Sequence, residues 1–336
     1  MIRKTISKHI SYNILKSLQY PSGLFGASKA NVSTGYEKAW IRDNFYEILG
    51  LESAGDYNSI KRAIYALLDA LKKHEYKIDW AIKEKPDARY KYIHARVCPH
   101  TYKEFYEEWG NKQNDSIGAF LFKVFDLIDK EKLKLRNHED LQILQKLVFY
   151  LASVEYWHDT DNGVWEENEE IHASSVGACV AGLKKAQDYV WVPDWLIEKG
   201  EATLNSLLPR ESIAKEVDLA LLSLIFPFNV VTKEQRFYIL KNVEKKLIRE
   251  RGVIRYFGDH YYSNGREAEW TMGFPWLARI YKDIGDKRKY DHYMKKTYSV
   301  MTWKGELPEL YFGKTDQPNE NTPLGWAQAM LLCALR

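Results

Sequence analysis

The chain has 336 residues, of which 45% are hydrophobic and 28% charged, and its formal net charge is +3. This composition is ordinary for a globular protein with a sizeable core, and it excludes disordered and collagen-like chains. The nearly balanced charge also argues against a nucleic-acid-binding surface. No stretch approaches the ~20 consecutive apolar residues of a membrane span, and the first residues lack the apolar segment of a secretory signal.

Three cysteines, Cys98, Cys179 and Cys333, lie far apart in the sequence and form no CxxC motif. An odd number at this spacing indicates free thiols in a reducing compartment, and neither a disulfide framework nor a zinc site. We therefore expect a cytoplasmic protein without a bound metal. The chain also contains 11 Trp and 23 Tyr, whose rings fill cores but also stack on the flat apolar faces of ligands.

Apolar residues recur at helical spacing almost throughout the chain, and alternating strand patterns are scarce. About twelve helices are predicted, near residues 3–18, 43–55, 57–74, 112–130, 138–157, 173–188, 193–206, 215–226, 233–249, 270–284, 287–302 and 321–335. They group into six consecutive pairs with no long Pro-, Gly- or Ser-rich linker, which predicts a single all-α domain over residues 1–336. Six helical hairpins are typical of an α/α barrel with two concentric helix layers, or of an open helical solenoid.

The connections between the helices favour the barrel. Long loops rich in Trp, Arg and carboxylates follow the first, third, fifth, ninth and eleventh predicted helices, whereas the opposite connections are mostly short. Functional residues on one set of loops are typical of a scaffold with a single active end. The segments at these connections and at the remaining equivalent one are GYEKAWIRD (35–43), WGNKQND (109–115), NGVWEE (162–167), EVDLALLS (216–223), RYFGDHYY (255–262) and LPELY (307–311).

In their order and spacing these segments resemble the glucoamylase family, glycoside hydrolase family 15, and the related hydrolase-like domain of phosphorylase kinase. The resemblance runs from about Ser22 to the C-terminus. It implies a six-hairpin α/α barrel, in agreement with the helix count, and hydrolysis of a terminal α-glucosidic bond with inversion. The implied partner is an oligosaccharide, with no cofactor, nucleic acid or membrane.

Inverting hydrolysis needs two carboxyl groups, an acid that protonates the leaving oxygen and a base that activates water on the other face. The resemblance implies that Glu166 is the acid and Glu309 the base. Judged from the residues alone, Glu166 lies in an acidic loop that could also support the start of the next helix. This chain has Leu310 where the family often carries Gln, a departure that removes one polar group but leaves the base intact.

A calcium loop is the further alternative for this acidic segment. Asp159, Asp161 and Glu170 fall at positions 1, 3 and 12 of an EF-hand-like count. The glycine of the motif is one place early, at Gly163, and the flanking helices do not fit, so calcium is disfavoured.

The resemblance also implies the sugar-binding residues. Arg42 and Asp43 would bracket adjacent hydroxyls of the terminal glucose through charge-assisted hydrogen bonds. Judged from the residues alone, Asp43 could be the N-cap of the helix at 43–55 with Arg42 as a neighbouring surface residue, and both roles can hold at once. The other implied sugar contacts are Tyr36, Trp40, Trp109, Gln113, Glu167 and Arg255. Three further carboxylates match the family but could cap helices or pair with Arg255: Asp115, Asp218 and Asp259.

We therefore expect an inverting, exo-acting α-glucosidase that acts on soluble oligosaccharides. The alternative from another class is a non-catalytic sugar-binding or regulatory module like the phosphorylase kinase domain, against which the retention of both carboxylates argues. A helical interaction scaffold would leave the loop segments unexplained. Phosphorolysis and trehalose cleavage stay open within the enzymes, as do the linkage, the chain-length preference and the oligomeric state.

Overall fold

The computed structural model describes residues 2–29 and 32–336. Within these residues the regular structure is almost entirely helical. The α-helices are α1 (Ile2–Leu18), α2 (Ile41–Ala54), α3 (Tyr57–Lys73), α4 (Glu75–Lys83), α5 (Asn114–Asp129), α6 (His138–Val154), α7 (Ala173–Ala186), α8 (Asp194–Leu207), α9 (Lys233–Lys246), α10 (Gly273–Asp283), α11 (Lys287–Ser299) and α12 (Gly325–Leu335). The 3-10 helices are η1 (Arg89–Lys91) and η2 (Leu219–Leu224), and the short strands are β1 (Ala39–Trp40), β2 (Arg96–Val97), β3 (Glu269–Trp270) and β4 (Leu310–Tyr311).

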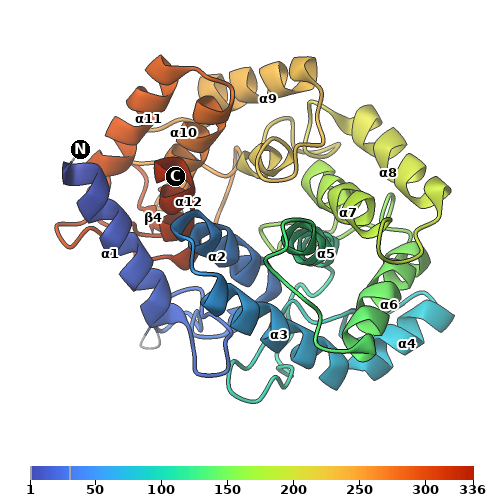
Figure 1. Cartoon of the computed structure of the whole chain (residues 1–336). Coiled ribbons are helices and arrows are strands. Elements are labelled where there is room, and N and C mark those ends of the chain that lie inside the picture. Colours follow the sequence, from blue (N-terminus) through green and yellow to red (C-terminus); the bar gives the residue numbers. More distant parts are fainter. Residues whose placement is uncertain (1, 30–31) are drawn as a thin grey trace.

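The helices form a closed ring of two layers (Figure 1). Helices α2, α5, α7, α10 and α12 make the inner layer together with η2, which contacts both α7 and α10. The other helices surround this layer, and α12 packs against α2 to close the ring. The predicted all-α, six-hairpin α/α barrel is thereby confirmed, and the open solenoid is wrong.

The apolar pattern of each helix explains its layer. Every residue of α12 is buried, as expected for a helix that is apolar all round, whereas α9 buries only Ile239, Leu240 and Val243 on one stripe. Two inner helices, α5 and α7, approach closely because Gly118 has no side chain. A Cβ atom there would lie 2.5 Å from the backbone of Ala178, so a larger residue would push the inner layer apart.

Two helices differ from the sequence-based expectation. The predicted helix over 215–226 is the short 3-10 helix η2, whose six residues are all buried; a fully buried apolar run has no polar face from which to read its period. Helix α4 was not predicted. It buries only Lys77, Ile78 and Ala81 and exposes Tyr76 and Trp80, so its apolar residues follow no helical stripe.

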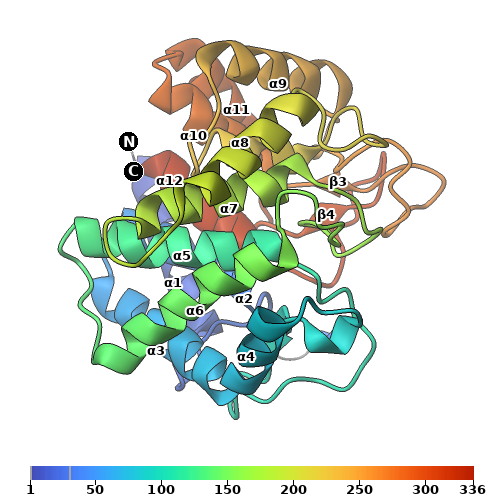
Figure 2. The same cartoon turned by 90° about the vertical axis from the view of Figure 1, so that its right-hand side faces the viewer.

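Short antiparallel strands join the loops that run from outer to inner helices. β1 pairs with β2, and β3 pairs with β4. Strands β3 and β4 lie at one end of the barrel, together with long loops (Figure 2). Because β1 directly precedes α2 and β4 directly follows Glu309, the pairing fixes the backbone beside the predicted site residues.

A buried ion pair at the start of α7 makes stability depend on pH. The ring of His172 lies 3.4 Å from a carboxylate oxygen of Glu211, which also accepts a hydrogen bond of 2.5 Å from the Ser174 hydroxyl. Burial opposes a charged imidazole, but Glu211 and Asp161 raise the pKa of His172 to about 9. Because this folded-state pKa lies above the ordinary value, the stabilisation is complete below about pH 6.5 and is lost as pH rises through about 9.

We predict that the free energy of unfolding, measured by urea titration, falls by on the order of 2–3 kcal/mol between about pH 6.5 and 9.5. The variant His172→Gln should lack this fall, because its side chain does not titrate. His138→Gln, which changes an exposed histidine, should retain it. An unchanged pH dependence in His172→Gln would assign the effect to other groups.

Candidate active site

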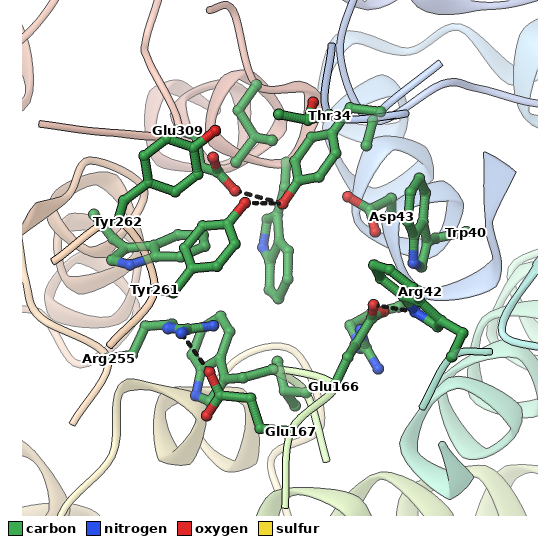
Figure 3. Close-up of a pocket in the computed structure, with 18 residues that line it drawn as sticks. Thr34, Trp40, Arg42, Asp43, Glu166, Glu167, Arg255, Tyr261, Tyr262 and Glu309 are labelled. Carbon is green, nitrogen blue, oxygen red and sulfur yellow. Dashed lines mark hydrogen bonds and ion pairs between the residues drawn. The ribbon is translucent and has the colours of Figure 1, made fainter. Parts of the chain in front are cut away.

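The loops from outer to inner helices surround a cavity of about 430 Å³ (Figure 3). This volume is in the usual range for small-molecule sites. Nine of the ten predicted site residues line it: Tyr36, Trp40, Arg42, Asp43, Trp109, Glu166, Glu167, Arg255 and Glu309. The structure thus brings together residues from five segments that are distant in sequence.

Glu166 lies in the connection between α6 and α7, with a left-handed backbone (φ 62°). A non-glycine residue in this conformation is strained, and such residues gather at functional sites. One carboxylate oxygen accepts a hydrogen bond of 3.1 Å from Nη1 of Arg42, and the other accepts one of 2.7 Å from the indole of Trp109. These two donors hold the Glu166 carboxylate in one orientation at the cavity wall.

Arg42 is the buried centre of a hydrogen-bond network. Its Nε and Nη2 atoms donate to the two oxygens of Asp115, at 2.6 and 3.1 Å. Nη2 also donates to the side chain of Gln113 at 2.5 Å and to the carbonyl of Gly163 at 3.2 Å. Burial opposes the charge, but Asp115 and Glu166 raise the pKa of Arg42 above its ordinary value. Gln113, the tenth predicted site residue, lies behind Arg42 and does not line the cavity.

Glu309 is fully buried in the loop before α12. One carboxylate oxygen accepts a hydrogen bond of 2.7 Å from the Tyr36 hydroxyl, and the other accepts bonds of 2.5 and 2.7 Å from the amides of Asn319 and Asn321. Burial raises the pKa of Glu309 above the ordinary carboxyl value, and these three donors oppose that rise. The Tyr261 hydroxyl lies 2.9 Å from that of Tyr36. Because the Tyr36 hydroxyl donates its hydrogen bond to Glu309, the Tyr261 hydroxyl is the donor in the hydrogen bond between the two tyrosines.

Asp43 is the third residue of α2, whose N-cap is Trp40. Its carboxyl group points into the cavity (Figure 3). Burial raises the pKa of Asp43 to about 7, and the neighbouring Arg42 opposes this rise. Asp43 is therefore not the N-cap of α2, and its carboxyl group faces the cavity.

Arg255 is held on the opposite wall by two carboxylates. It donates to both oxygens of Asp259, at 2.7 and 2.6 Å, and to Glu167 at 2.5 Å. Of the three carboxylates with open roles, Asp259 pairs with Arg255 and Asp115 binds Arg42. Asp218 caps η2 through the backbone N–H of Ala220 at 2.8 Å and accepts a hydrogen bond of 2.8 Å from the Trp165 indole.

Aromatic side chains that were not singled out complete the cavity. They are Trp165, Tyr261, Tyr262, Trp270 and Trp326. The rings of Trp165 and Trp326 are stacked with their centroids 6.1 Å apart, and Trp270 lies 5.5 Å from Trp165. Flat apolar rings beside charged groups suit a sugar, which has apolar C–H faces and polar hydroxyls. The sequence carried a partial signal, since three of these rings, Trp165, Tyr261 and Tyr262, lie within the quoted segments.

The carboxylates of the EF-hand-like count accept hydrogen bonds from other groups of the protein. Asp161 accepts hydrogen bonds of 3.1 Å from the Gly163 backbone and from the Ser175 hydroxyl. In the described ranges, no group of three or more His, Cys, Asp or Glu side chains could hold a metal ion. No helix among the described residues has the length and apolarity needed to span a bilayer.

We predict that Arg42→Lys lowers the free energy of unfolding by about 2–3 kcal/mol, because an ammonium group cannot reproduce the two-pronged contact with Asp115 and leaves buried acceptors unpaired. The matched control is Arg89→Lys, which alters an exposed arginine that also contacts two carboxylates and should cost under about 0.5 kcal/mol. Urea unfolding measures both. Equal costs would contradict the central role of the Arg42 network.

Comparisons with known proteins agree with the fold. The chain is 20% identical to a wild-type glycosidase of known structure, with a TM-score of 0.84 over 99% of this chain and 96% of that one. The glucoamylase from Saccharomycopsis fibuligera is 16% identical, with a TM-score of 0.65 over 99% of this chain and 94% of that one. At these identities the likeness shows the fold.

Sequence relatives include the probable phosphorylase b kinase regulatory subunit alpha of Drosophila melanogaster, which is 25% identical over 372 aligned positions. The match covers 92% of this chain but only 29% of that subunit. The skeletal muscle isoform of Oryctolagus cuniculus is 24% identical over 84% of this chain and 28% of its own length. Residues 3–190 match the family described as Glycosyl hydrolases family 15. The chain therefore belongs to glycosyl hydrolase family 15.

Proposed function

We propose that this protein is an inverting, exo-acting α-glucosidase that releases terminal α-linked glucose from soluble oligosaccharides. The observation that carries the proposal is a single cavity with two carboxyl groups, Glu166 and Glu309, on opposite walls (Figure 3). Carboxyl groups that face each other across a sugar are what single displacement requires. Membership of a glycosyl hydrolase family supports the same reaction class.

In this proposal Glu309 is the base. Its carboxylate is ionised with the help of Tyr36, Asn319 and Asn321, and it takes a proton from the water that attacks the anomeric carbon. Glu166 donates a proton to the departing oxygen. Each oxygen of Glu166 accepts one hydrogen bond, from Arg42 or from Trp109, and keeps a second lone pair that can carry the proton of the acid.

The sugar in the cavity would be a chain end. Inner-layer helices contribute to the lining of the cavity, with Trp326 from α12. Arg42 and Asp43 would bind the hydroxyls of a terminal ring, while Glu167 and Arg255 would hold the next ring across the scissile bond. Trp40 and Trp109 supply apolar faces for these sugars.

A regulatory module is the second candidate. It is favoured by the named relatives, which are phosphorylase b kinase regulatory subunits, and by the two donors that occupy both oxygens of Glu166. The chain spans less than a third of those subunits, so their assembly does not carry over to it. In such a module the cavity would bind a sugar without turnover.

Two further expectations stay proposals. A cytoplasmic location is supported by the three cysteines, which are free thiols in the structure. A single catalytic domain over residues 1–336 is supported by the ring, because helices from both ends of the sequence close it.

We predict that Glu166→Gln and Glu309→Gln each lower turnover of an α-glucoside by a factor of about 10²–10⁴, since a general acid or base contributes that much. Glu169→Gln and Glu320→Gln change exposed carboxylates in the same two loops and should keep nearly full activity. Circular dichroism should show all four variants folded. Near-native activity in either catalytic variant would remove that residue from its role.

The same assay tests the stereochemistry. Proton NMR of the first product, recorded before mutarotation, should show β-glucose, because water attacks opposite the leaving oxygen. Initial α-glucose would overturn the single-displacement mechanism. If every α-linked glucoside were bound but none cleaved, the regulatory module would be the better description.

A further prediction concerns the acid limb of the pH profile of kcat/KM, which reports ionisation of the base in the free enzyme. Tyr36→Phe removes a hydrogen bond that lowers the pKa of Glu309, so the acid limb should move to higher pH. Tyr261→Phe removes only a bond to Tyr36 and should move the limb less. An unmoved limb in Tyr36→Phe would show that another group controls it.

A further inference from the structure

A second hollow, of about 720 Å³, lies on the outer surface of the barrel between α9 and the turn from α10 to α11. We call it the basic groove and define it by the side chains with which α9 lines it: Lys233, Arg236, Phe237, Leu240, Lys241 and Lys245. The opposite wall belongs to α11 and the end of α10, which are neighbours of α9 in both views (Figures 1 and 2). None of the lining residues also lines the candidate active site.

The positive charge of the basic groove is not neutralised by the protein itself. In the ranges that the structure describes, Lys233, Arg236, Lys241 and Lys245 form no ion pair. Helix α9 as a whole carries five basic and two acidic side chains, so its formal charge of +3 equals that of the entire chain. A concentration of unpaired cations on one helix face attracts an anionic partner and steers it to this surface.

The carboxylates in the basic groove are already bound. Glu244 accepts hydrogen bonds of 2.7 Å from the ammonium group of Lys289 and from the Tyr293 hydroxyl, which ties α9 to α11. Asp286 caps α11 by accepting a hydrogen bond of 2.9 Å from the backbone N–H of Lys289. Because both carboxylates have partners of their own, the four unpaired cations remain available to a ligand.

An open aromatic ring stands among these cations. Phe237 is 59% exposed, although α9 turns Ile239 and Val243 into the core. The centroid of the Phe237 ring is 5.9 Å from the ammonium nitrogen of Lys241, and Ile284 lines the facing wall. An exposed ring in a hollow rimmed by charged side chains is typical of an interaction surface.

The length and spacing of the basic groove decide between the possible ligands. Lys233 and Lys245 are twelve residues apart on one helix, about 18 Å at 1.5 Å per residue, so a small anion reaches only one end of the row. A nucleic acid carries a charge at every backbone repeat and would bring phosphates against Glu244 and Asp286. An amphipathic helix presents carboxylates and apolar side chains on one face at the same period as α9, so it can match the cations and Phe237 together.

We propose that the basic groove docks an acidic, amphipathic helix of a partner protein. Carboxylates of that helix pair with the four unpaired cations, and its apolar side chains cover Phe237. The charges supply attraction and orientation, and the apolar contact supplies most of the affinity. Docking there is independent of the proposed function, because the basic groove lies apart from the cavity and would take its partner whether or not the cavity cleaves a sugar.

Fluorescence polarisation with a designed 14-residue peptide tests the inference. The labelled probe repeats the sequence Glu-Glu-Leu-Leu-Glu-Glu-Leu twice. One control peptide has Lys in place of every Glu, and the other has Gln in place of every Leu. The native chain should bind the probe more tightly than either control, and binding should weaken severalfold when NaCl is raised from about 0.05 to about 0.5 M.

Variants of the chain locate the binding. Lys241→Glu/Lys245→Glu should weaken binding of the probe about tenfold or more, because two attractions become repulsions. Phe237→Ala should weaken it roughly three- to tenfold through the lost apolar contact. The matched control is Arg288→Glu/Lys295→Glu, which makes the same charge change at two exposed residues of α11 outside the groove and should weaken binding less than about twofold. Native-like circular dichroism is expected for every variant, because all five side chains are exposed.

Equal losses in the groove and control variants, or no binding of the probe to the native chain, would overturn the inference. Equal affinity for the Gln-containing peptide would also overturn it, because the groove would then be a non-specific cationic surface. Single-stranded RNA or phosphatidylserine vesicles that bind more tightly than the probe, and lose affinity in Lys241→Glu/Lys245→Glu, would assign the groove to a different class of ligand.

Discussion

The buried guanidinium of Arg42 holds the candidate active site together. It joins the first turn of α2 to Asp115 at the start of α5 and to the loop that carries Gly163 and Glu166. A buried cation costs several kcal/mol unless its donors are matched by well-placed acceptors. The need to pair the donors of Arg42 therefore fixes the positions of these three segments relative to one another. Gln113 supplies a further acceptor for Arg42.

The carboxyl groups of Glu166 and Glu309 have very different surroundings. Hydrogen bonds from Arg42 and Trp109, which belong to other segments, orient the Glu166 carboxylate. The strained backbone of Glu166 places this residue at the cavity wall. Glu309 is instead enclosed by neutral donors, Tyr36 and two asparagines. Neutral donors orient a carboxylate without neutralising its charge, which leaves that charge available to take a proton from water. The asymmetry matches an acid on one side and a base on the other.

Much of the fold could be predicted from the sequence because most helices show one apolar stripe or a continuous apolar run between clear breaks. The exceptions have physical reasons: η2 is buried on every side, and α4 turns Tyr76 and Trp80 to solvent. Rim strands of two residues carry no pattern at all. Burial and pairing across the ring decide these elements, and neither is local.

The candidate site, like the fold, could be predicted from the sequence only in part. The motif resemblance identified residues that the structure gathers in one cavity, but their mutual contacts could not be read from spacing. Tyr36 and Glu309 are 273 positions apart and still share a hydrogen bond. Asn319 and Asn321 were not among the predicted site residues, although both donate hydrogen bonds to Glu309. Gln113 was interpreted as a sugar contact, and only the packed structure places it behind Arg42.

The arrangement of charges also explains how one scaffold can serve in hydrolases and in regulatory subunits. The barrel and the rim contacts of Arg42 are needed to form the cavity, whichever use is made of it. The proposed turnover makes one additional demand, that the departing oxygen of a bound sugar lie against a lone pair of Glu166 that neither Arg42 nor Trp109 occupies. A sugar that instead moved Arg42 or Trp109 away from Glu166 would have to pair with the displaced donor, because a guanidinium or indole left buried and unpaired would cost about 1–3 kcal/mol. The proposed reaction would therefore depend on how the sugar binds beside Arg42 and Trp109, and not on the presence of the two carboxyl groups alone.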